Sequence, residues 1–201
     1  TAAVQAPSQI AFTVKVRGKA SHAGFAPQDG VHAIRIAATA IAEMAIGRIG
    51  DDTTVNVGHI EGGRASNIVP DYCEVSGELR SFSHKKALEE LAKVEQIFAK
   101  EAEKCGGSIE FIRDICYQAY KTDENESVVK EFQKACAACG IKSSLIATFG
   151  GSDQNKMSEH GIPGIVMASA MHQVHSCQEY TEVSEMAQVA GIVSELLQMK
   201  E

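Results

Sequence analysis

Four short stretches of the sequence carry side chains that could do chemistry. The first is Ser21-His22-Ala23-Gly24, whose small residues leave the imidazole of His22 open to whatever lies in front of it. It lies in the stretch 18–30, between an alternating strand pattern and a long apolar helix pattern. Histidine changes charge near neutral pH, and loops held by regular elements commonly carry function. His22 is therefore a candidate functional residue, and a solvated turn histidine is the alternative.

The second stretch is Gly62-Gly63-Arg64-Ala65-Ser66-Asn67, at the start of a strand pattern that carries Arg80 near its far end. The amide of Asn67 can hydrogen-bond a polarised carbonyl, and the guanidinium of Arg80 offers two parallel donors to a carboxylate. Both side chains could therefore contact a substrate. The alternative for Arg80 is an ordinary ion pair with Glu78 or Glu74.

The third stretch is Gly150-Gly151-Ser152-Asp153, which joins a strand pattern to a short helix pattern. Glycine lets a ligand approach the backbone, and N–H groups at a helix start can bind anions. Gly150, Gly151 and Ser152 are therefore candidate binding residues. The alternative is an ordinary strand–helix connection with Ser152 or Asp153 as the N-cap.

The fourth stretch, residues 171–179, reads Met-His-Gln-Val-His-Ser-Cys-Gln-Glu. It follows an apolar strand pattern at its carboxyl end, where α/β sheets bind ligands. His172, His175 and Glu179 could supply one metal ligand and the groups around it, but a zinc site needs at least three protein ligands. A thiol enzyme using Cys177 beside His175 is a further alternative, for which the sequence shows no third orienting group.

The patterns in residues 8–117 alternate between strand and helix. Side chains alternate in polarity in the strands, and the second helix has an apolar stripe of Leu88, Leu91, Val94, Phe98 and Ala102. We expect Gln28 or Asp29 to cap the first helix and Ser83 the second. The order βαββαβ predicts a ferredoxin-like, four-stranded antiparallel sheet with two helices on one face. The strands are expected at 10–17, 53–59, 67–81 and 109–117, and the helices at 31–46 and from 84 for about twenty residues.

Residues 118–201 follow a different plan. Two helix patterns, 126–139 and 182–199, alternate with two apolar strand patterns, 144–149 and 162–168, which favours a parallel α/β sheet. Two strands cannot cover their own faces, so this part is expected to need more sheet from a preceding segment. Residues 1–7 are predicted to be a linker from that segment.

Composition limits the classes of partner. The net charge is −7 and no run of Lys and Arg is present, which argues against nucleic-acid binding. No apolar run approaches the roughly 18 residues that span a bilayer, so no membrane partner is expected. Six irregularly spaced cysteines predict a reduced, cytoplasmic protein. The pair Cys136 and Cys139 matches C-x-x-C but lies near the end of a helix pattern, which indicates a structural role.

Five motifs in one order carry a family resemblance. They are ASHAG (20–24), GGRASNIVP (62–70), ELR (78–80), GGSD (150–153) and HSCQE (175–179). Together they resemble the dizinc amidohydrolase family of peptidase T, aminoacylase and glutamate carboxypeptidase. The closest similarity is to the peptidase T-like branch, and it covers essentially the whole chain.

The resemblance implies a zinc-dependent hydrolase of small peptides or acyl-amino acids, in which two zinc ions activate a water and polarise the amide carbonyl. Residues 8–117 would be a lid that forms a homodimer, and 118–201 the closing part of the catalytic domain. The other metal-binding motifs of the family have no counterpart here, so this chain alone is expected to be inactive. A non-catalytic ferredoxin-like dimerisation module is the alternative.

The resemblance also implies roles for individual residues. His175 would be the last zinc ligand, with Glu179 as its motif partner rather than a ligand. His22 would reach the active site of the partner subunit and stabilise the oxyanion of the tetrahedral intermediate. Asn67 and Arg80 would contact the substrate, and the backbone of residues 150–152 would line the pocket.

Overall fold

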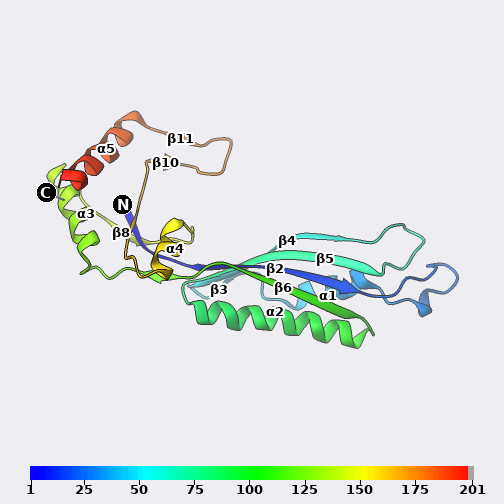
Figure 1. Ribbon diagram of the computed structural model, residues 1–201. Helices are drawn as coiled ribbons and strands as arrows, with labels where there is room; N and C mark the ends of the chain where they lie inside the picture. The colour runs from blue at the N-terminus through cyan, green and yellow to red at the C-terminus, as the bar shows by residue number, and fades with distance from the viewer. Residues whose placement is uncertain (199–201) are drawn as a thin grey trace. The chain divides into compact units, whose positions relative to one another are not determined.

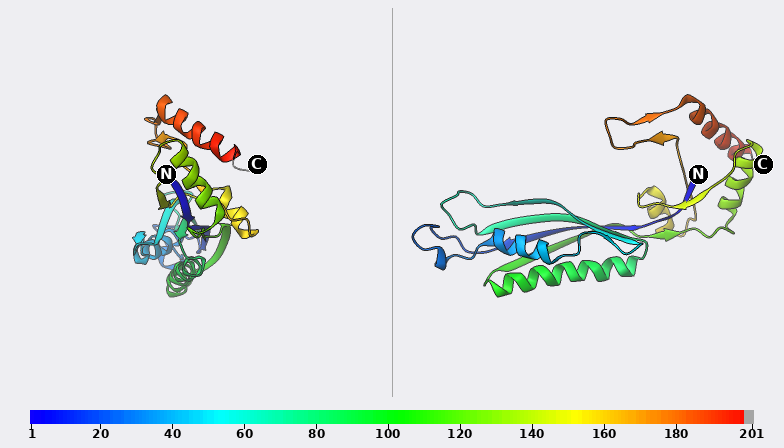
Figure 2. Two further views of the ribbon diagram at one scale, coloured as in Figure 1. Left: turned by 90° about the vertical axis from the view of Figure 1, so that its left-hand side faces the viewer. Right: turned by 180° about the vertical axis from the view of Figure 1, so that it is seen from behind.

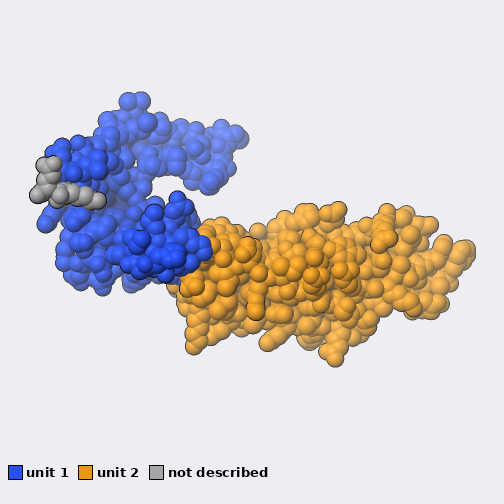
Figure 3. All heavy atoms as spheres, in the orientation of Figure 1, with its two compact units in different colours: residues 1–7, 119–201 blue, residues 8–118 orange. Residues whose placement is uncertain are grey.

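The structure is a computed structural model, which describes residues 1–198 and is shown from several sides in Figures 1 and 2. The chain divides into two compact units, coloured separately in Figure 3. Unit 1 comprises residues 1–7 and the chain from Ala119 onward, and unit 2 is Ser8–Gln118.

Unit 2 is built on one antiparallel sheet with the strand order β3-β4-β5-β2-β6. The strands are β2 (Ser8–Arg17), β3 (Gly47–Ile49), β4 (Thr53–Gly62), β5 (Tyr72–Ser81) and β6 (Ser108–Tyr117). Two helices, α1 (Ala33–Glu43) and α2 (His84–Lys104), cover one face of this sheet (Figure 1). The predicted ferredoxin-like arrangement is confirmed, with the short edge strand β3 as an addition.

The alternation in β2, which lies between β5 and β6, places one face of this strand in the core. Ile10, Phe12, Val14 and Val16 are at most 2% exposed and form the centre of the core beneath the helices. The predicted apolar stripe of α2 meets them with Leu91, Val94, Phe98 and Ala102, all buried, whereas Leu88 is exposed. Burial of such side chains contributes roughly 1.5–3 kcal/mol each, so this face stabilises the unit strongly.

The beginning of α1 differs from the prediction. His32 is the N-cap, and its Nδ1 accepts a hydrogen bond from the backbone N of Arg35 at 3.2 Å. Gln28 and Asp29 instead lie in a separate 3₁₀ turn, Pro27–Asp29. Ser83 caps α2 as predicted, accepting from the backbone N of Lys86 at 3.3 Å.

The third predicted strand is shorter than expected. Strand β5 begins at Tyr72 rather than at Asn67. Residues 67–69 hydrogen-bond to the loop around His22 instead of continuing the sheet, and Pro70 has no N–H to donate to a strand partner. Strand periodicity cannot reveal such a competing partner.

Unit 1 contains a second, smaller sheet. Its strands are β1 (Ala2–Ala6), β7 (Tyr120–Lys121), β8 (Leu145–Ala147) and β9 (Val166–Met167). β1 pairs parallel with β8 but antiparallel with β7 and β9, so this sheet is mixed rather than wholly parallel. The prediction that residues 1–7 are a linker was wrong. Ala2–Ala6 forms the strand with which the other three strands of this sheet pair. Its small apolar side chains fit this buried position.

Helices α3 (Ser127–Ala138) and α5 (Val183–Gln198) pack against each other and against this sheet through Phe132, Ile192 and Ala2. The unit also contains the short helix α4 (Asp153–Glu159) and the hairpin of β10 (Met171–His172) and β11 (Tyr180–Thr181). Cys136 is buried at the last turn of α3, where burial raises the pKa of its thiol, as fits a structural side chain. None of the helices described in residues 1–198 has the length and apolar character needed to cross a membrane.

Candidate functional site

The loop between β2 and α1 fixes the ring of His22. Its Nδ1 accepts hydrogen bonds from the backbone N of Gly24 at 3.1 Å and of Phe25 at 3.2 Å. The ring also contacts Phe25, with 4.3 Å between ring centroids and the two ring planes tilted by 31°. Since Nδ1 is an acceptor in both bonds, the neutral ring carries its proton on Nε2. His22 therefore presents an N–H donor on the side away from its own loop.

The segment that carries Asn67 is joined to the His22 loop. The backbone N of Ala23 donates to the carbonyl of Asn67 at 2.9 Å, and the N of Val69 donates to the carbonyl of Ser21 at 2.9 Å. The side chains of His22 and Asn67 are both exposed. The structure thus brings the first two candidate stretches together at one end of unit 2.

Arg80 lies elsewhere in unit 2. Gln9 pairs with Arg80 at one end of β2, whereas Arg17, which precedes the His22 loop, pairs with Tyr72 at the other. The guanidinium of Arg80 bonds the carboxylate of Glu78, with Nε to Oε1 at 2.8 Å and Nη2 to Oε2 at 3.2 Å. This contact lowers the pKa of Glu78 and raises the pKa of Arg80. Here the alternative that the sequence left open, an ion pair with Glu78, is observed.

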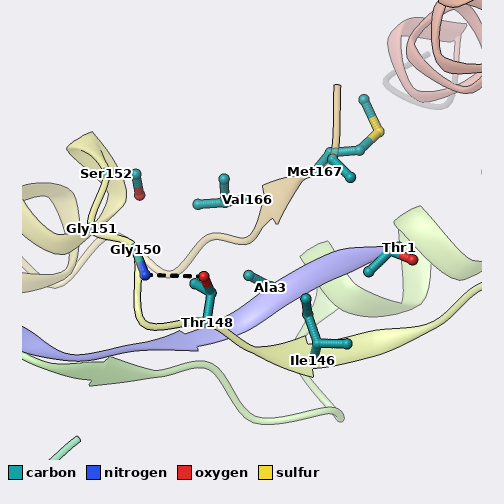
Figure 4. Close-up of a pocket in the computed structure, with 10 residues that line it drawn as sticks. Thr1, Ala3, Ile146, Thr148, Gly150, Gly151, Ser152, Val166 and Met167 are labelled. Carbon is teal, nitrogen blue, oxygen red and sulfur yellow. Dashed lines mark hydrogen bonds between the residues drawn. The ribbon is translucent and has the colours of Figure 1, made fainter. Parts of the chain in front are cut away.

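The Gly150-Gly151-Ser152 stretch lines a pocket of about 240 Å³ in unit 1 (Figure 4). Apolar side chains from β1, β8 and β9 form most of its wall, and the backbone N of Gly150 donates to Oγ1 of Thr148 at 3.1 Å. The pocket is therefore mostly apolar with a few polar groups at one side, as is usual for ligand pockets.

Asn155 supports this stretch and was missed from the sequence. It is fully buried, its Oδ1 accepts from the backbone N of Ser152 at 3.1 Å, and its Nδ2 donates to the carbonyl of Pro7 at 3.0 Å. In the sequence, the only indication of this role was a polar residue two positions after the GGSD motif. Ser152 is the N-cap of α4, as the alternative reading of this stretch expected.

The fourth stretch separates its two histidines. His172 bonds Glu185 of α5, Nε2 to Oε2 at 2.5 Å, and stacks on Tyr180. His175 is exposed, and its ring has no hydrogen-bond partner within residues 1–198. The carboxylate of Glu179 accepts from the backbone N of His175 at 2.9 Å. His175 is thus the histidine available to a ligand.

A zinc ion could take His175 as one ligand, since an imidazole without a partner is a suitable donor. In the part of the chain that the structure describes, no three His, Cys, Asp or Glu side chains gather into a possible metal site. The residues present therefore fit one coordination position and not a complete zinc site. Cys177 is an exposed free thiol.

Comparison with known proteins places these observations in a family. Residues 7–105 match the Peptidase dimerisation domain of the M20 type. They belong to that family. This dimerisation domain covers most of unit 2, including the His22 loop, the Asn67 segment and Arg80.

Two solved structures extend the similarity of the chain beyond the dimerisation domain. Aminopeptidase PepT from Bacillus cereus is 36% identical with a TM-score of 0.89, and a tripeptidase from Staphylococcus aureus is 31% identical with a TM-score of 0.93. Each match covers 98% of this chain and 53% of the other. The predicted resemblance to the peptidase T-like branch is confirmed.

A curated relative, the uncharacterized protein YqjE of Bacillus subtilis, is 35% identical over 195 residues, which are 97% of this chain and 53% of the relative. The chain therefore spans about half the length of these relatives.

Proposed function

We propose that this chain is the dimerisation domain and the closing part of the catalytic domain of a zinc-dependent peptidase or amidohydrolase, which hydrolyses small peptides or acyl-amino acids. The similarity to an aminopeptidase and a tripeptidase supports the reaction class. The observation that carries the proposal is the His22 ring, whose Nδ1 is occupied by two backbone N–H groups. That arrangement leaves an oriented N–H donor for a substrate oxygen.

His22 is proposed to stabilise the oxyanion that forms when water adds to the amide carbonyl. Its Nε2–H would donate to the oxygen as negative charge develops there. Because two backbone N–H groups and Phe25 already hold the ring, little reorganisation is needed during the reaction. Loss of one such donor in other enzymes costs about 2.7–4 kcal/mol of transition-state stabilisation.

His175 is proposed as a ligand of one of two zinc ions. When bound, the ions would polarise the carbonyl and lower the pKa of the attacking water. The remaining ligands would come from the half of the relatives that this chain does not cover. We therefore propose that the active enzyme is a longer protein containing this chain, and that the chain alone is inactive.

The substrate contacts follow from the two loop regions. The exposed amide of Asn67 would bind a carbonyl of the substrate, and the backbone of Gly150, Gly151 and Ser152 would line its pocket. Arg80 is proposed to bind a substrate carboxylate. Because Glu78 already bonds its guanidinium, that role requires the substrate carboxylate to replace or share Glu78.

The surface of unit 1 supports the proposal of a longer protein. A hollow of about 690 Å³ lies among Phe132, Ile192 and neighbouring residues of β9 and β10. On α5, Val183 is 82% exposed and Leu197 is 69% exposed. Large apolar side chains that are exposed to solvent in this way usually mark a surface that another part of the protein covers.

A homodimer through unit 2 is part of the same proposal, supported by the dimerisation domain that this unit contains. We also propose a cytoplasmic location, because the six cysteines, all within the described residues, are free. A dimerisation module without catalysis is the second candidate function. It is favoured by the family match, which ends at residue 105 and so leaves out His175.

Zinc content and hydrolysis of a tripeptide would test the proposal. We expect about two zinc ions per subunit and turnover in the longer protein. His175→Ala should lower the zinc content and abolish turnover, and His160→Ala, which alters an exposed histidine of the same unit, should change neither. The 201-residue chain should neither hold two zinc ions nor hydrolyse the tripeptide. Turnover by that chain, abolished by His175→Ala, would refute the proposed inactivity. A longer protein without zinc or turnover would favour the dimerisation module.

A further inference from the structure

The segment before and at His175 has an unusual backbone. Ala170 (φ 62°), Gln173 (φ 51°) and His175 (φ 64°) are the non-glycine residues with positive φ in residues 1–198. This left-handed conformation is unfavourable for a residue with a Cβ, so neighbouring contacts must hold it. All of these residues fall within the loop 170–175, which connects β9 to the candidate metal ligand.

Each of the three residues has a backbone group held by a side chain. The carbonyl of Ala170 accepts from Oγ1 of Thr181 at 2.6 Å, and the carbonyl of Gln173 accepts from Oγ of Ser176 at 2.7 Å. The N–H of His175 donates to Oε2 of Glu179 at 2.9 Å. The three donors and acceptors lie after His175 in the chain, so the returning half of the hairpin fixes the outgoing half.

The hairpin is itself attached to helix α5. Strands β10 and β11 pair through Met171 with Thr181 and His172 with Tyr180. The bond between His172 and Glu185 then ties β10 to the helix, and the stacking of His172 on Tyr180, at 4.8 Å between ring centroids, braces the hairpin. The loop therefore has a fixed base from which His175 projects.

We propose that Glu179 is a positioning residue that holds the backbone of His175 in the left-handed conformation needed to present its imidazole to zinc. Its carboxylate accepts from the N–H of His175, so it acts on the φ of that residue and not on the metal. A hydrogen bond to a carboxylate is stronger than one between neutral groups. The bond from the His175 N–H to Glu179 can therefore offset the cost of the positive φ at His175. The inference rests on the proposed role of His175 as a ligand.

Two variants of Glu179 separate positioning from metal binding. Glu179→Gln keeps an oxygen that can accept from the His175 N–H, whereas Glu179→Ala removes it. Glu182→Ala, which alters an exposed carboxylate nearby, is the matched control. In the 201-residue chain, the hydrogen-exchange rate of the His175 amide measures how well the bond to residue 179 is retained. In the longer protein, titration with zinc alone reports the site.

We expect Glu179→Ala to speed exchange of the His175 amide about tenfold, the effect of losing one hydrogen bond. Zinc affinity should fall about 10- to 100-fold, as when a partner of a metal ligand is removed. Glu179→Gln should retain most of both properties, and Glu182→Ala should change neither.

Two results would overturn the inference. Unchanged exchange and unchanged zinc affinity in Glu179→Ala would show that the contact does not hold the loop. Loss of zinc in Glu179→Gln as complete as in His175→Ala, with the amide still protected, would make Glu179 a ligand. Failure of the wild-type longer protein to bind zinc would instead refute the proposed function, and this inference with it.

Discussion

The backbone N–H of Ala23 donates a hydrogen bond to the carbonyl of Asn67 at 2.9 Å. This contact joins two loops that are far apart in the sequence, and both partners are main-chain groups. The side chains of His22 and Asn67 are therefore not needed to hold the loops together. Asn67 can be replaced without breaking this contact, whereas the ring of His22 also accepts hydrogen bonds from the backbone N of Gly24 and Phe25 within its own loop.

For His22→Ala in the longer protein, we expect kcat to fall about 100- to 1000-fold, because an oriented donor to the oxyanion is lost. Zinc content should stay unchanged, since His22 is proposed to touch the substrate and not the metal. Steady-state kinetics with metal analysis measure both quantities. His59→Ala, at an exposed position on β4, is the control. Loss of zinc in His22→Ala would show that His22 is a ligand.

Replacement of Asn67 should affect substrate binding alone. Because the fold uses the carbonyl of this residue, Asn67→Ala should leave the melting temperature of the chain unchanged. In the longer protein, kcat/KM should fall about tenfold, the effect of one lost hydrogen bond. Ser66→Ala, at the exposed neighbouring position, should change neither. An unaltered kcat/KM would exclude the proposed contact with the substrate.

The pair of Glu78 and Arg80 predicts a pH-dependent stability. The hydrogen bond from Arg80, with a smaller contribution from Gln9, lowers the pKa of Glu78 from its ordinary value of 4.5. The ionised carboxylate therefore stabilises the folded state above about pH 4.5, and this stabilisation is lost as the pH falls through the lowered value. Since the pair is partly exposed, Glu78→Gln should reduce the free energy of unfolding by only about 1 kcal/mol at pH 7.

Denaturant titrations across the acid range would check this pH dependence. The difference between wild type and Glu78→Gln should shrink below about pH 4 as the wild-type carboxylate becomes protonated. Glu61→Gln, on the exposed end of β4, should match the wild type throughout. A difference that is constant with pH would mean that the ionised pair does not stabilise unit 2.

The core of unit 2 should depend strongly on Phe98. Its side chain is fully buried on α2, so Phe98→Ala should lower the free energy of unfolding by about 3–5 kcal/mol through the lost burial and the cavity left behind. Leu88 lies on the same helix but is 37% exposed, and Leu88→Ala should cost less than about 1 kcal/mol. Chemical unfolding of both variants gives the comparison. Equal losses would contradict the observed packing of α2.

Local patterns in the sequence predicted much of the fold. The alternation of Ile10, Phe12, Val14 and Val16 and the apolar stripe of α2 depend on near neighbours in the chain, so they indicate element type and the buried face. Ser83 could be recognised as a cap for the same reason. The order of these elements then restricted unit 2 to a small number of topologies.

Contacts between distant residues were not predictable in the same way. The sequence could not show that Ala2–Ala6 is a strand shared by β7, β8 and β9, or that Nδ2 of Asn155 donates to the carbonyl of Pro7. Each depends on a partner that is brought near by the fold. No periodicity records such a partner.

For the candidate site, the sequence by itself determined which side chains are present and in what order, which was sufficient for the family resemblance. Only the tertiary structure decided that His22 presents its Nε2–H, that Asn67 lies beside its loop and that Arg80 is bonded to Glu78. The physical reason is that a hydrogen bond tolerates a change of only a few tenths of an ångström in distance and a few tens of degrees in angle. The packing of whole elements sets both.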